Sequence, residues 1–235
     1  MRNNDARLQP DKSVSTRILN EDYFEELDKK LCRFKSLRAE AVELSKGIIG
    51  DNLLLEDQFF TSALGKIVDV LDGLSIMLRE RNVSCSGVLL RVQLDNLMRV
   101  FAAFISEDRK KFISSFLEGT PINKLKDNDG RLMTDGQLRR RLTLYCPKIN
   151  KVYKEMSGFV HLSASAYEKT WWLIQDNVIN VAIGISAREE LNPKLLEIAD
   201  AFIYFVELEF ELLDKVVVSK SVADEELRNK SILNE

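Results

Sequence analysis

Apolar side chains recur at steps of three and four residues along the first half of the chain, which is the spacing of one face of an α-helix. Four such runs, each long enough for a helix, cover residues 22–48, 54–81, 84–105 and 108–117. Gly50 follows the first run, and Gly119 and Pro121 follow the fourth, as expected where helices end. The pattern predicts four helices in this half, with Ser84 or Ser86 as the cap of the third.

Further helices are predicted in the second half of the chain. Thr134 is a suitable N-cap for a helix that begins at Asp135, and Pro147 separates that helix from another over about 148–161. The Asn-Pro pair at 192–193 is typical of a cap followed by a first-turn proline. A long run of apolar residues at helical spacing follows it, so we expect the last long helix to begin there.

A different pattern separates these helices. Residues 170–175 and 178–183 are rich in β-branched and aromatic residues, and the Asp-Asn pair at 176–177 lies between them as a two-residue turn. We expect a hairpin that the tryptophans at 171–172 pack onto the helices, because an isolated hairpin is marginally stable in water. The predicted fold class is all-α: a helical bundle of five to seven helices with one small β-hairpin at about 170–185.

Length and composition set the domain organisation. The chain has 235 residues, of which 45% are hydrophobic and 30% charged, as is typical of a soluble globular protein. We interpret residues 1–20 as a mobile polar arm, 21–219 as a single helical domain and 220–235 as a mobile polar tail. The N-terminus has no apolar segment and no run reaches about 18 uncharged apolar residues, so we expect neither a signal peptide nor a membrane helix.

The few cysteines and the single histidine limit the chemistry. Cys32, Cys85 and Cys146 follow no zinc-binding spacing and stand beside apolar residues, so we interpret them as reduced, buried side chains of a cytoplasmic protein. The segment 127–130 (Asp-Asn-Asp-Gly) is similar to the start of an EF-hand loop, but Leu138 stands where that loop needs a glutamate. We therefore predict no metal site and no cofactor.

The most informative polar residues lie around the single histidine. Tyr153, Ser157 and His161 are four residues apart, so a helix over 148–161 would place them on one face. Lys154 stands two turns before His161 on nearly the same face. Histidine is the side chain best suited to exchange protons near neutral pH, which makes this face a candidate catalytic site. The alternative is a histidine that only caps carbonyls or bonds inside the bundle.

A second polar set lies on the predicted third helix. Arg91, Asp95 and Arg99 are four residues apart within a segment rich in leucine, valine and phenylalanine. If they face inward, Asp95 organises the two guanidinium groups near the histidine helix, where they would bind phosphate. If they face solvent, they form surface pairs worth only tenths of a kcal/mol.

The pattern Tyr-x-x-x-Ser-x-x-x-His-x-Ser after a long helical pair that carries Arg-x-x-x-Asp resembles bacterial proteins of the HEPN superfamily. The resemblance covers about residues 56–215 in architecture. The HEPN signature is an arginine, then four to six residues, then a histidine, often with a polar residue right after the arginine. The matching positions are Lys154, Glu155 and His161. Lysine replaces the family's arginine, so the planar fork that binds phosphate at two points is lost.

The resemblance implies an all-α bundle and a role in defence or toxin systems, where many HEPN domains are metal-independent ribonucleases and others are non-catalytic. In such a ribonuclease the 2′-hydroxyl of RNA attacks the adjacent phosphorus. His161 would move the proton, Lys154 with Arg91 or Arg99 would offset the charge on the phosphorane, and Ser157 and Tyr153 would complete the site. Because these sites often lie on a two-fold axis, the resemblance also implies a homodimer.

Charge is unevenly distributed along the chain. Residues 108–154 contain twelve basic and five acidic residues, a net charge of +7, and since the whole chain carries −3 the remainder carries −10. The basic segment, which includes Arg139, Arg140 and Arg141, is a candidate phosphate-binding face. A solvated segment balanced by the acidic last helix is the alternative.

Two further functions remain open at this point. The chain could be a non-catalytic helical module that binds a protein partner through its amphipathic helices, or a structural homodimer with a vestigial site. Whether Lys154 and His161 line a cleft or lie in a satisfied core distinguishes these functions from RNA cleavage.

Overall fold

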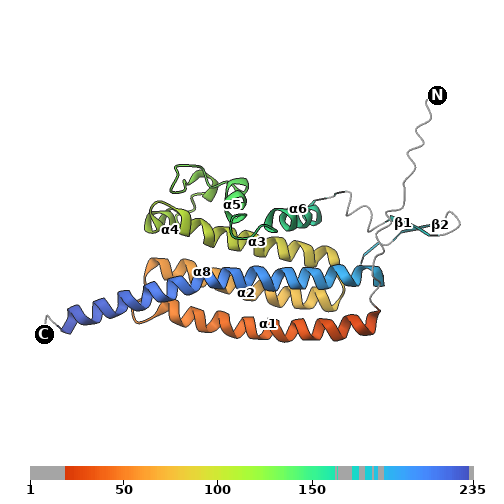
Figure 1. Cartoon of the computed structure of the whole chain (residues 1–235), viewed down its shortest axis with the longest axis horizontal. Coiled ribbons are helices and arrows are strands. Elements are labelled where there is room, and N and C mark those ends of the chain that lie inside the picture. The colour runs from red at the N-terminus through yellow and green to blue at the C-terminus, as the bar shows by residue number, and fades with distance from the viewer. Residues whose placement is uncertain are drawn as a thin grey trace, which may run out of the picture.

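The fold is built on four long helices that lie side by side (Figure 1). The computed structural model describes residues 19–161, 163, 171–174, 178–181, 183–184 and 188–232. The long helices are α1 (Asn20–Ile49), α2 (Leu55–Arg79), α3 (Val83–Ile105) and α8 (Asn192–Ile232). α1 and α3 each pack against both α2 and α8, which closes the four into a bundle. The predicted all-α helical bundle is therefore confirmed.

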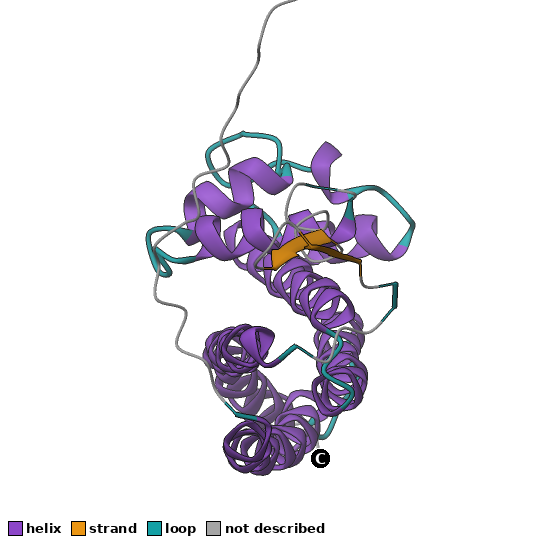
Figure 2. Ribbon diagram, turned by 90° about the vertical axis from the view of Figure 1, so that its right-hand side faces the viewer, coloured by secondary structure: helices purple, strands orange, loops and turns teal. Residues whose placement is uncertain are grey.

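A second, outer layer of shorter elements covers α3 on the side away from α1 (Figure 1). Its members are α4 (Arg109–Leu117), the 3-10 turn η1 (Ile122–Lys124), α5 (Asp135–Leu142) and α6 (Ile149–Val160). Seen end-on in Figure 2, the long helices gather on one side of the molecule and the shorter ones on the other. α4, α5 and α6 all contact α3, and α4 also contacts α2, so α3 is the long helix that carries most of the second layer.

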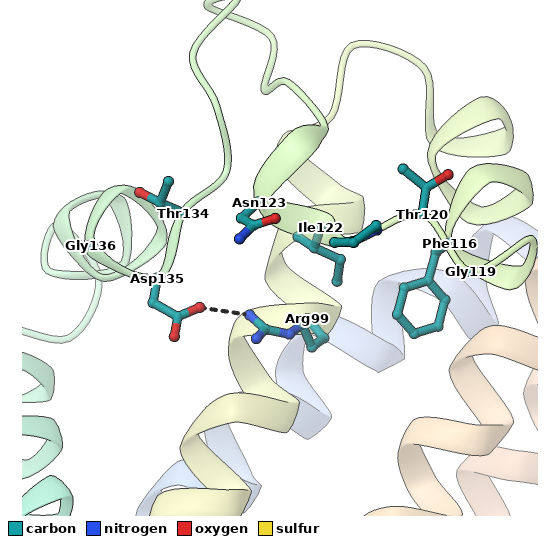
Figure 3. Close-up of a pocket in the computed structure, with 10 residues that line it drawn as sticks. Arg99, Phe116, Gly119, Thr120, Ile122, Asn123, Thr134, Asp135 and Gly136 are labelled. Carbon is teal, nitrogen blue, oxygen red and sulfur yellow. Dashed lines mark hydrogen bonds and ion pairs between the residues drawn. The ribbon is translucent and has the colours of Figure 1, made fainter.

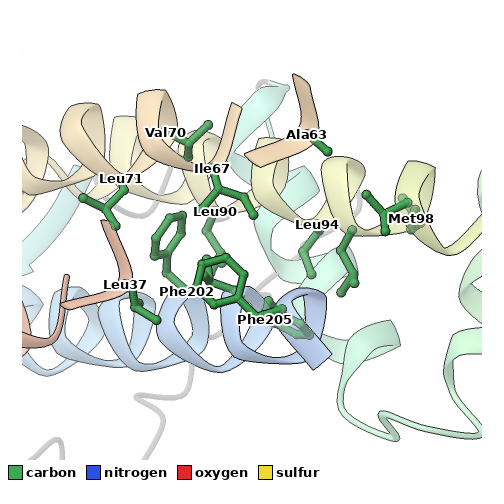
Figure 4. Close-up of a cluster of buried hydrophobic side chains, with 14 of the residues drawn as sticks. Leu37, Ala63, Ile67, Val70, Leu71, Leu90, Leu94, Met98, Phe202 and Phe205 are labelled. Carbon is green, nitrogen blue, oxygen red and sulfur yellow. The ribbon is translucent and has the colours of Figure 1, made fainter. Parts of the chain in front are cut away.

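The core lies between the four long helices. Figure 4 shows α8 contributing Phe202 and Phe205, which meet Leu90 and Leu94 of α3 and Leu37 of α1. All five side chains are fully buried. These residues stand at apolar positions spaced three or four residues apart in their helices, so the apolar faces predicted from the sequence form the core. Burial of each large apolar side chain contributes about 1.5–3 kcal/mol before conformational entropy is counted.

One carboxyl group lies inside this core. Glu209 of α8 is completely buried, and its oxygens accept hydrogen bonds from Gln93 Nε2 at 2.7 Å and Asn96 Nδ2 at 2.9 Å. Burial disfavours the charged carboxylate and raises the pKa of Glu209 well above its usual value, although the bond from Gln93 opposes that shift. Asn96 also donates to the carbonyl of Ala63, so this group ties α8 and α3 to α2.

A buried ion pair joins the far part of α8 to the turn between α1 and α2. Lys220 Nζ lies 2.9 Å from Asp57 Oδ2 and 3.6 Å from Asp224 Oδ1, and it also donates to the carbonyl of Asn52. Gly50 ends α1 with φ +55° beside these groups, and a β-carbon there would meet Asp224 Oδ2. The predicted start of a mobile tail at residue 220 is wrong, because α8 continues to Ile232.

Local capping explains where several helices begin. The side chains of Asn82, Asp108 and Thr134 accept hydrogen bonds from backbone N–H groups at the starts of α3, α4 and α5. Thr134 was predicted, whereas the cap of α3 is Asn82 and neither of the two serines expected. α5 ends at Leu142, which is earlier than the boundary that Pro147 suggested.

Strands β1 (Trp171–Ile174) and β2 (Val178–Val181) pair antiparallel, with Trp171 opposite Val181. The turn expected at 176–177 and the packing of the tryptophan side chains lie outside the described residues, as does the arm over 1–18. A short 3-10 turn, η3 (Glu189–Leu191), leads into α8. None of the helices described is long and apolar enough to cross a membrane.

The cysteines differ from the expectation of uniform burial. Cys146 is fully buried, whereas Cys32 on α1 and Cys85 on α3 are exposed. Apolar neighbours in the sequence do not settle exposure here, because residues next to one another on a helix point about 100° apart.

Candidate functional site

The candidate site forms where α6 crosses α3, and a glycine on α3 allows the close approach. A β-carbon at Gly87 would lie 2.5 Å from the ring of Phe159, so any larger residue there would push α6 away. Seated this way, α6 brings Tyr153 and Ser157 to Arg91 of α3. Two predicted polar sets, one from each helix, therefore meet in the structure.

Arg91 is the centre of this meeting point. Its Nε donates to Ser157 Oγ at 3.3 Å, and its Nη2 donates to the Tyr153 hydroxyl. The guanidinium carbon also lies 3.7 Å from the centroid of the Tyr153 ring, a cation–π contact. Nη1 forms an ion pair with Asp95 one turn along α3, and the Arg91 side chain is only 13% exposed. Arg91 is thus held by three different side chains.

Asp135, the first residue of α5, connects this centre to Arg99. Its Oδ1 lies 3.1 Å from Arg99 Nη1, and its Oδ2 accepts a hydrogen bond from the Tyr153 hydroxyl at 3.1 Å. Arg91 Nη2 lies 3.8 Å away. Burial alone would raise the pKa of Asp135, but the charge and hydrogen bond of Arg99, the hydrogen bond from Tyr153 and the charge of Arg91 together outweigh burial, so the net pKa lies below its usual value. Asp135 is therefore a carboxylate at neutral pH.

Arg139 completes the group one turn further along α5. Its guanidinium carbon lies 4.0 Å from the centroid of the Tyr153 ring, and its Nε donates to the backbone carbonyl of Asp135 at 3.3 Å. We call the seven residues described so far the arginine cluster: Arg91, Asp95, Arg99, Asp135, Arg139, Tyr153 and Ser157. Three guanidinium groups and two carboxylates give the cluster a net charge of +1. An anion is thus favoured beside it.

The Tyr153 phenol is held between these charges. Burial raises its pKa above the usual value, the positive charge of Arg91 opposes that change, and the negative charge of Asp135 adds to it. The phenol therefore stays protonated at neutral pH and acts as a hydrogen-bond donor to Asp135. In this cluster Tyr153 links Arg91 to Asp135 through its hydroxyl.

His161 lies just beyond the end of the helix that was predicted to carry it. α6 ends at Val160, and His161 follows in an extended conformation with φ −116° and ψ 156°. The helix therefore carries Tyr153 and Ser157 on one face and ends before His161, so helical spacing does not extend to the third member of the predicted ridge. The His161 side chain is exposed, and so is Lys154. Both are accessible to a substrate, and neither belongs to the arginine cluster.

The three consecutive arginines of α5 point to different surroundings. Arg139 belongs to the arginine cluster and Arg140 is exposed. Arg141 Nη1 binds the loop before α5, at 3.0 Å from Asp127 Oδ2 and 2.9 Å from Asp129 Oδ2. Arg141 therefore differs from the other two in binding carboxylates of its own chain, and phosphate binding by the three arginines stays a prediction.

The segment that is similar to an EF-hand start has a structural role. Both oxygens of the buried Asp127 accept hydrogen bonds, Oδ1 from the backbone N–H groups of Asp129 and Arg131, and Oδ2 from Arg141 and Gln137. Burial would raise the pKa of Asp127, but these bonds lower it overall. Both oxygens of this carboxylate are therefore already used in hydrogen bonds within the chain. No group of three His, Cys, Asp or Glu side chains in the described part of the chain is placed to hold a metal ion.

A pocket of about 670 Å³ opens beside the arginine cluster, between the end of α4, η1 and the start of α5. Figure 3 shows the ion pair between Arg99 and Asp135 on one side of it and Phe116 on the other. Asn123 and Thr120 lie along its rim. The cluster therefore faces a space large enough for a small molecule.

Asp135 was not predicted as a site residue, and Arg139 was predicted as a phosphate-binding residue but not as a neighbour of Tyr153. Thr134 correctly predicted where α5 begins, and that start fixes Asp135 in the first turn. The missing information was the packing of α5 on α3, which brings Asp135 to Arg99 across 36 residues of chain. Asp95 was expected to hold both flanking arginines, but it pairs with Arg91 while Arg99 pairs with Asp135.

Comparison of this chain with protein-family models, with curated proteins and with solved structures finds no match.

Proposed function

We propose that this chain is a HEPN-like helical protein that binds single-stranded RNA on the outer layer formed by α4, α5 and α6, and that His161 takes part in cleaving the bound strand. The observation that carries the proposal is the placement of the basic segment. Residues 108–154, with their net charge of +7, make up this one layer on α3. The charge asymmetry of the sequence thus becomes an asymmetry between two sides of the molecule.

Most of the basic side chains of this layer face solvent. The exposed ones are Lys110, Lys111, Lys124, Lys126, Arg131, Arg140, Lys148, Lys151 and Lys154. None of them forms an ion pair with another residue of the described ranges, in contrast to Arg141. Unpaired exposed lysines are the groups that neutralise phosphates and release counterions on binding. They supply affinity for a phosphate backbone without sequence preference.

Cleavage would depend on His161 and Lys154 at the end of this layer. In a metal-independent mechanism the 2′-hydroxyl loses its proton as it attacks the adjacent phosphorus, and the 5′-oxygen gains a proton as its bond to phosphorus breaks. An exposed histidine can carry both transfers, which is typical of general acid–base catalysis. Lys154 would offset charge on the phosphorane as a single point charge. The exposure of both side chains supports access by an RNA strand.

A specific observation favours a second function, a non-catalytic RNA-binding or protein-binding module. Arg91 and Arg99, expected to help at the phosphorane, are engaged by Asp95 and Asp135. No hydrogen bond to a described residue orients His161, whereas catalytic histidines are usually held by a partner. These features allow binding by the layer without cleavage. The HEPN resemblance also supports a homodimer.

Salt-dependent RNA binding tests the role of the layer. The test variant carries Lys148→Ala, Lys151→Ala and Lys154→Ala, and the matched control carries Lys35→Ala, Lys66→Ala and Lys215→Ala. The control lysines are also exposed and come from α1, α2 and α8, so both variants lose three positive charges. The readout is fluorescence anisotropy of a labelled single-stranded RNA at several salt concentrations.

For single strands the log–log slope is about −0.7 per neutralised phosphate, so three lost contacts lower its magnitude by up to about 2. The proposal expects this reduction in the α6 variant and little change in the control. Equal weakening in both variants, or no binding by the unmodified protein at low salt, would contradict it.

A further inference from the structure

We propose that the pocket beside Arg99 binds one nucleotide, with its phosphate on the Arg99 guanidinium and its base against Phe116. The same chemistry, a phosphate joined to a flat base, occurs in a free nucleoside monophosphate and in one unstacked unit of an RNA strand. Only the RNA source rests on the function proposed above. The pocket itself is defined by residues that do not belong to the exposed lysine set.

The size and shape of the pocket suit a ligand of this class. Its volume of about 670 Å³ falls within the range of small-molecule sites. Three chain segments line it: the end of α4, η1 and the start of α5, with Arg99 of α3 at its base (Figure 3). It is a surface pocket of the same layer that carries the basic segment.

Arg99 gives the pocket its preference for an anion. Among the described residues its only polar partner is Asp135, which contacts Nη1. The remaining guanidinium N–H groups are available to a ligand, and the side chain is about one third exposed. Both oxygens of Asp135 are engaged, by Arg99 and by the Tyr153 hydroxyl. Together with the net charge of +1 on the arginine cluster, this arrangement favours a phosphate over a cation.

The opposite wall suits a nucleobase. The Phe116 ring lies there, fixed by a T-shaped contact with Phe59 whose ring centroids are 5.1 Å apart, and Ile122 adds apolar surface. Aromatic side chains are the usual stacking platform for unpaired bases. Asn123 presents an amide at the rim (Figure 3), and an asparagine amide matches the donor and acceptor edge of adenine. Adenosine monophosphate (AMP) is therefore the probe of choice.

Glycine at position 136 provides a selective way to fill the pocket. A β-carbon there meets only Thr134 Oγ1, at 4.0 Å, so a larger side chain is accommodated by the protein but occupies ligand space. Gly136 also lies inside α5, where leucine forms helix better than glycine, so Gly136→Leu should not unfold the chain. Gly65→Leu is the matched control, because Gly65 lies in α2 with nothing within 4 Å of its β-carbon position.

The experiment measures AMP and adenosine binding by isothermal titration calorimetry, and RNA binding by anisotropy, for the unmodified protein and both variants. We expect AMP to bind, adenosine to bind more weakly, and Gly136→Leu to weaken AMP at least ten-fold while Gly65→Leu does not. Phe116→Leu should weaken AMP by about 5- to 150-fold, the loss expected for one stacked base.

The outcomes separate the two ligand sources and the two proposals. If AMP does not bind but Gly136→Leu alone weakens RNA, the pocket takes a unit of the strand and the proposal holds. AMP binding that Gly136→Leu abolishes, without any RNA binding, supports the pocket and refutes the RNA function. If Gly136→Leu and Gly65→Leu behave alike toward both AMP and RNA, the pocket proposal is wrong.

Discussion

Lys220→Met should strongly destabilise the protein, because the substitution leaves buried carboxylates without their cation. The Lys220 and Asp57 side chains are both only 3% exposed, and their charged atoms are 2.9 Å apart. Methionine has nearly the volume and length of lysine, so the substitution removes the charge with little loss of packing. Asp57 keeps its bond from the backbone of Leu54, but no other cation lies within 4 Å of it among the described residues.

The size of the effect follows from burial. Removing one partner of a buried ion pair typically costs about 3–5 kcal/mol, because the other charge remains out of water. For a chain of this length the melting temperature falls by about 2–4 °C per kcal/mol, which gives a decrease of roughly 6–20 °C. The loss should appear in the whole bundle, since Lys220 joins α8 to the turn between α1 and α2.

Urea denaturation followed by circular dichroism at 222 nm measures this loss. Lys215→Met is the control, because Lys215 is exposed on the same helix and should change the free energy of unfolding by less than about 0.5 kcal/mol. A loss below about 1 kcal/mol for Lys220→Met, or equal losses in the two variants, would refute the assignment of a buried ion pair and with it the packing of residues 217–224.

Two other predictions concern buried groups. Burial raises the pKa of Glu209 well above 4.5, so above that pH folding takes up a proton and the free energy of unfolding falls as pH rises. Glu209→Gln should remove this dependence. In urea denaturation from pH 5 to pH 8, the free energy of unfolding of the variant should therefore rise relative to that of the unmodified protein. A constant difference between the two proteins over that range would contradict the burial of a titrating acid. Thiol titration of the native protein should find Cys32 and Cys85 reacting quickly and Cys146 slowly, with all three reactive after unfolding. Three equally fast thiols would contradict the burial of Cys146.

The helices and the core could be predicted from the sequence because both depend on local spacing. The apolar positions of α1 through α3 repeat every three or four residues, and those positions are buried. The end of α8 could not be predicted in the same way. Lys220 and Asp224 are charged, so the pattern indicated a solvated tail, yet each also binds a partner more than 160 residues away in the chain.

The candidate site was predictable only where its residues share a helix. Arg91 with Asp95, and Tyr153 with Ser157, follow from four-residue spacing. Their meeting depends on how α6 packs on α3, and neither spacing nor composition contains that information. The predicted face also assumed a helix that includes His161, whereas α6 ends one residue before it.

The function proposed for the outer layer is tested most directly by an RNA-cleavage assay in the presence of a metal chelator, with the unmodified protein and His161→Ala. The account predicts cleavage by the unmodified protein and a rate lower by about 10²–10⁴-fold in the variant, the usual contribution of general acid–base catalysis. The melting temperature should be unchanged, because the His161 side chain is exposed. RNA that binds without being cleaved, or cleavage that continues undiminished in His161→Ala, would contradict the catalytic role.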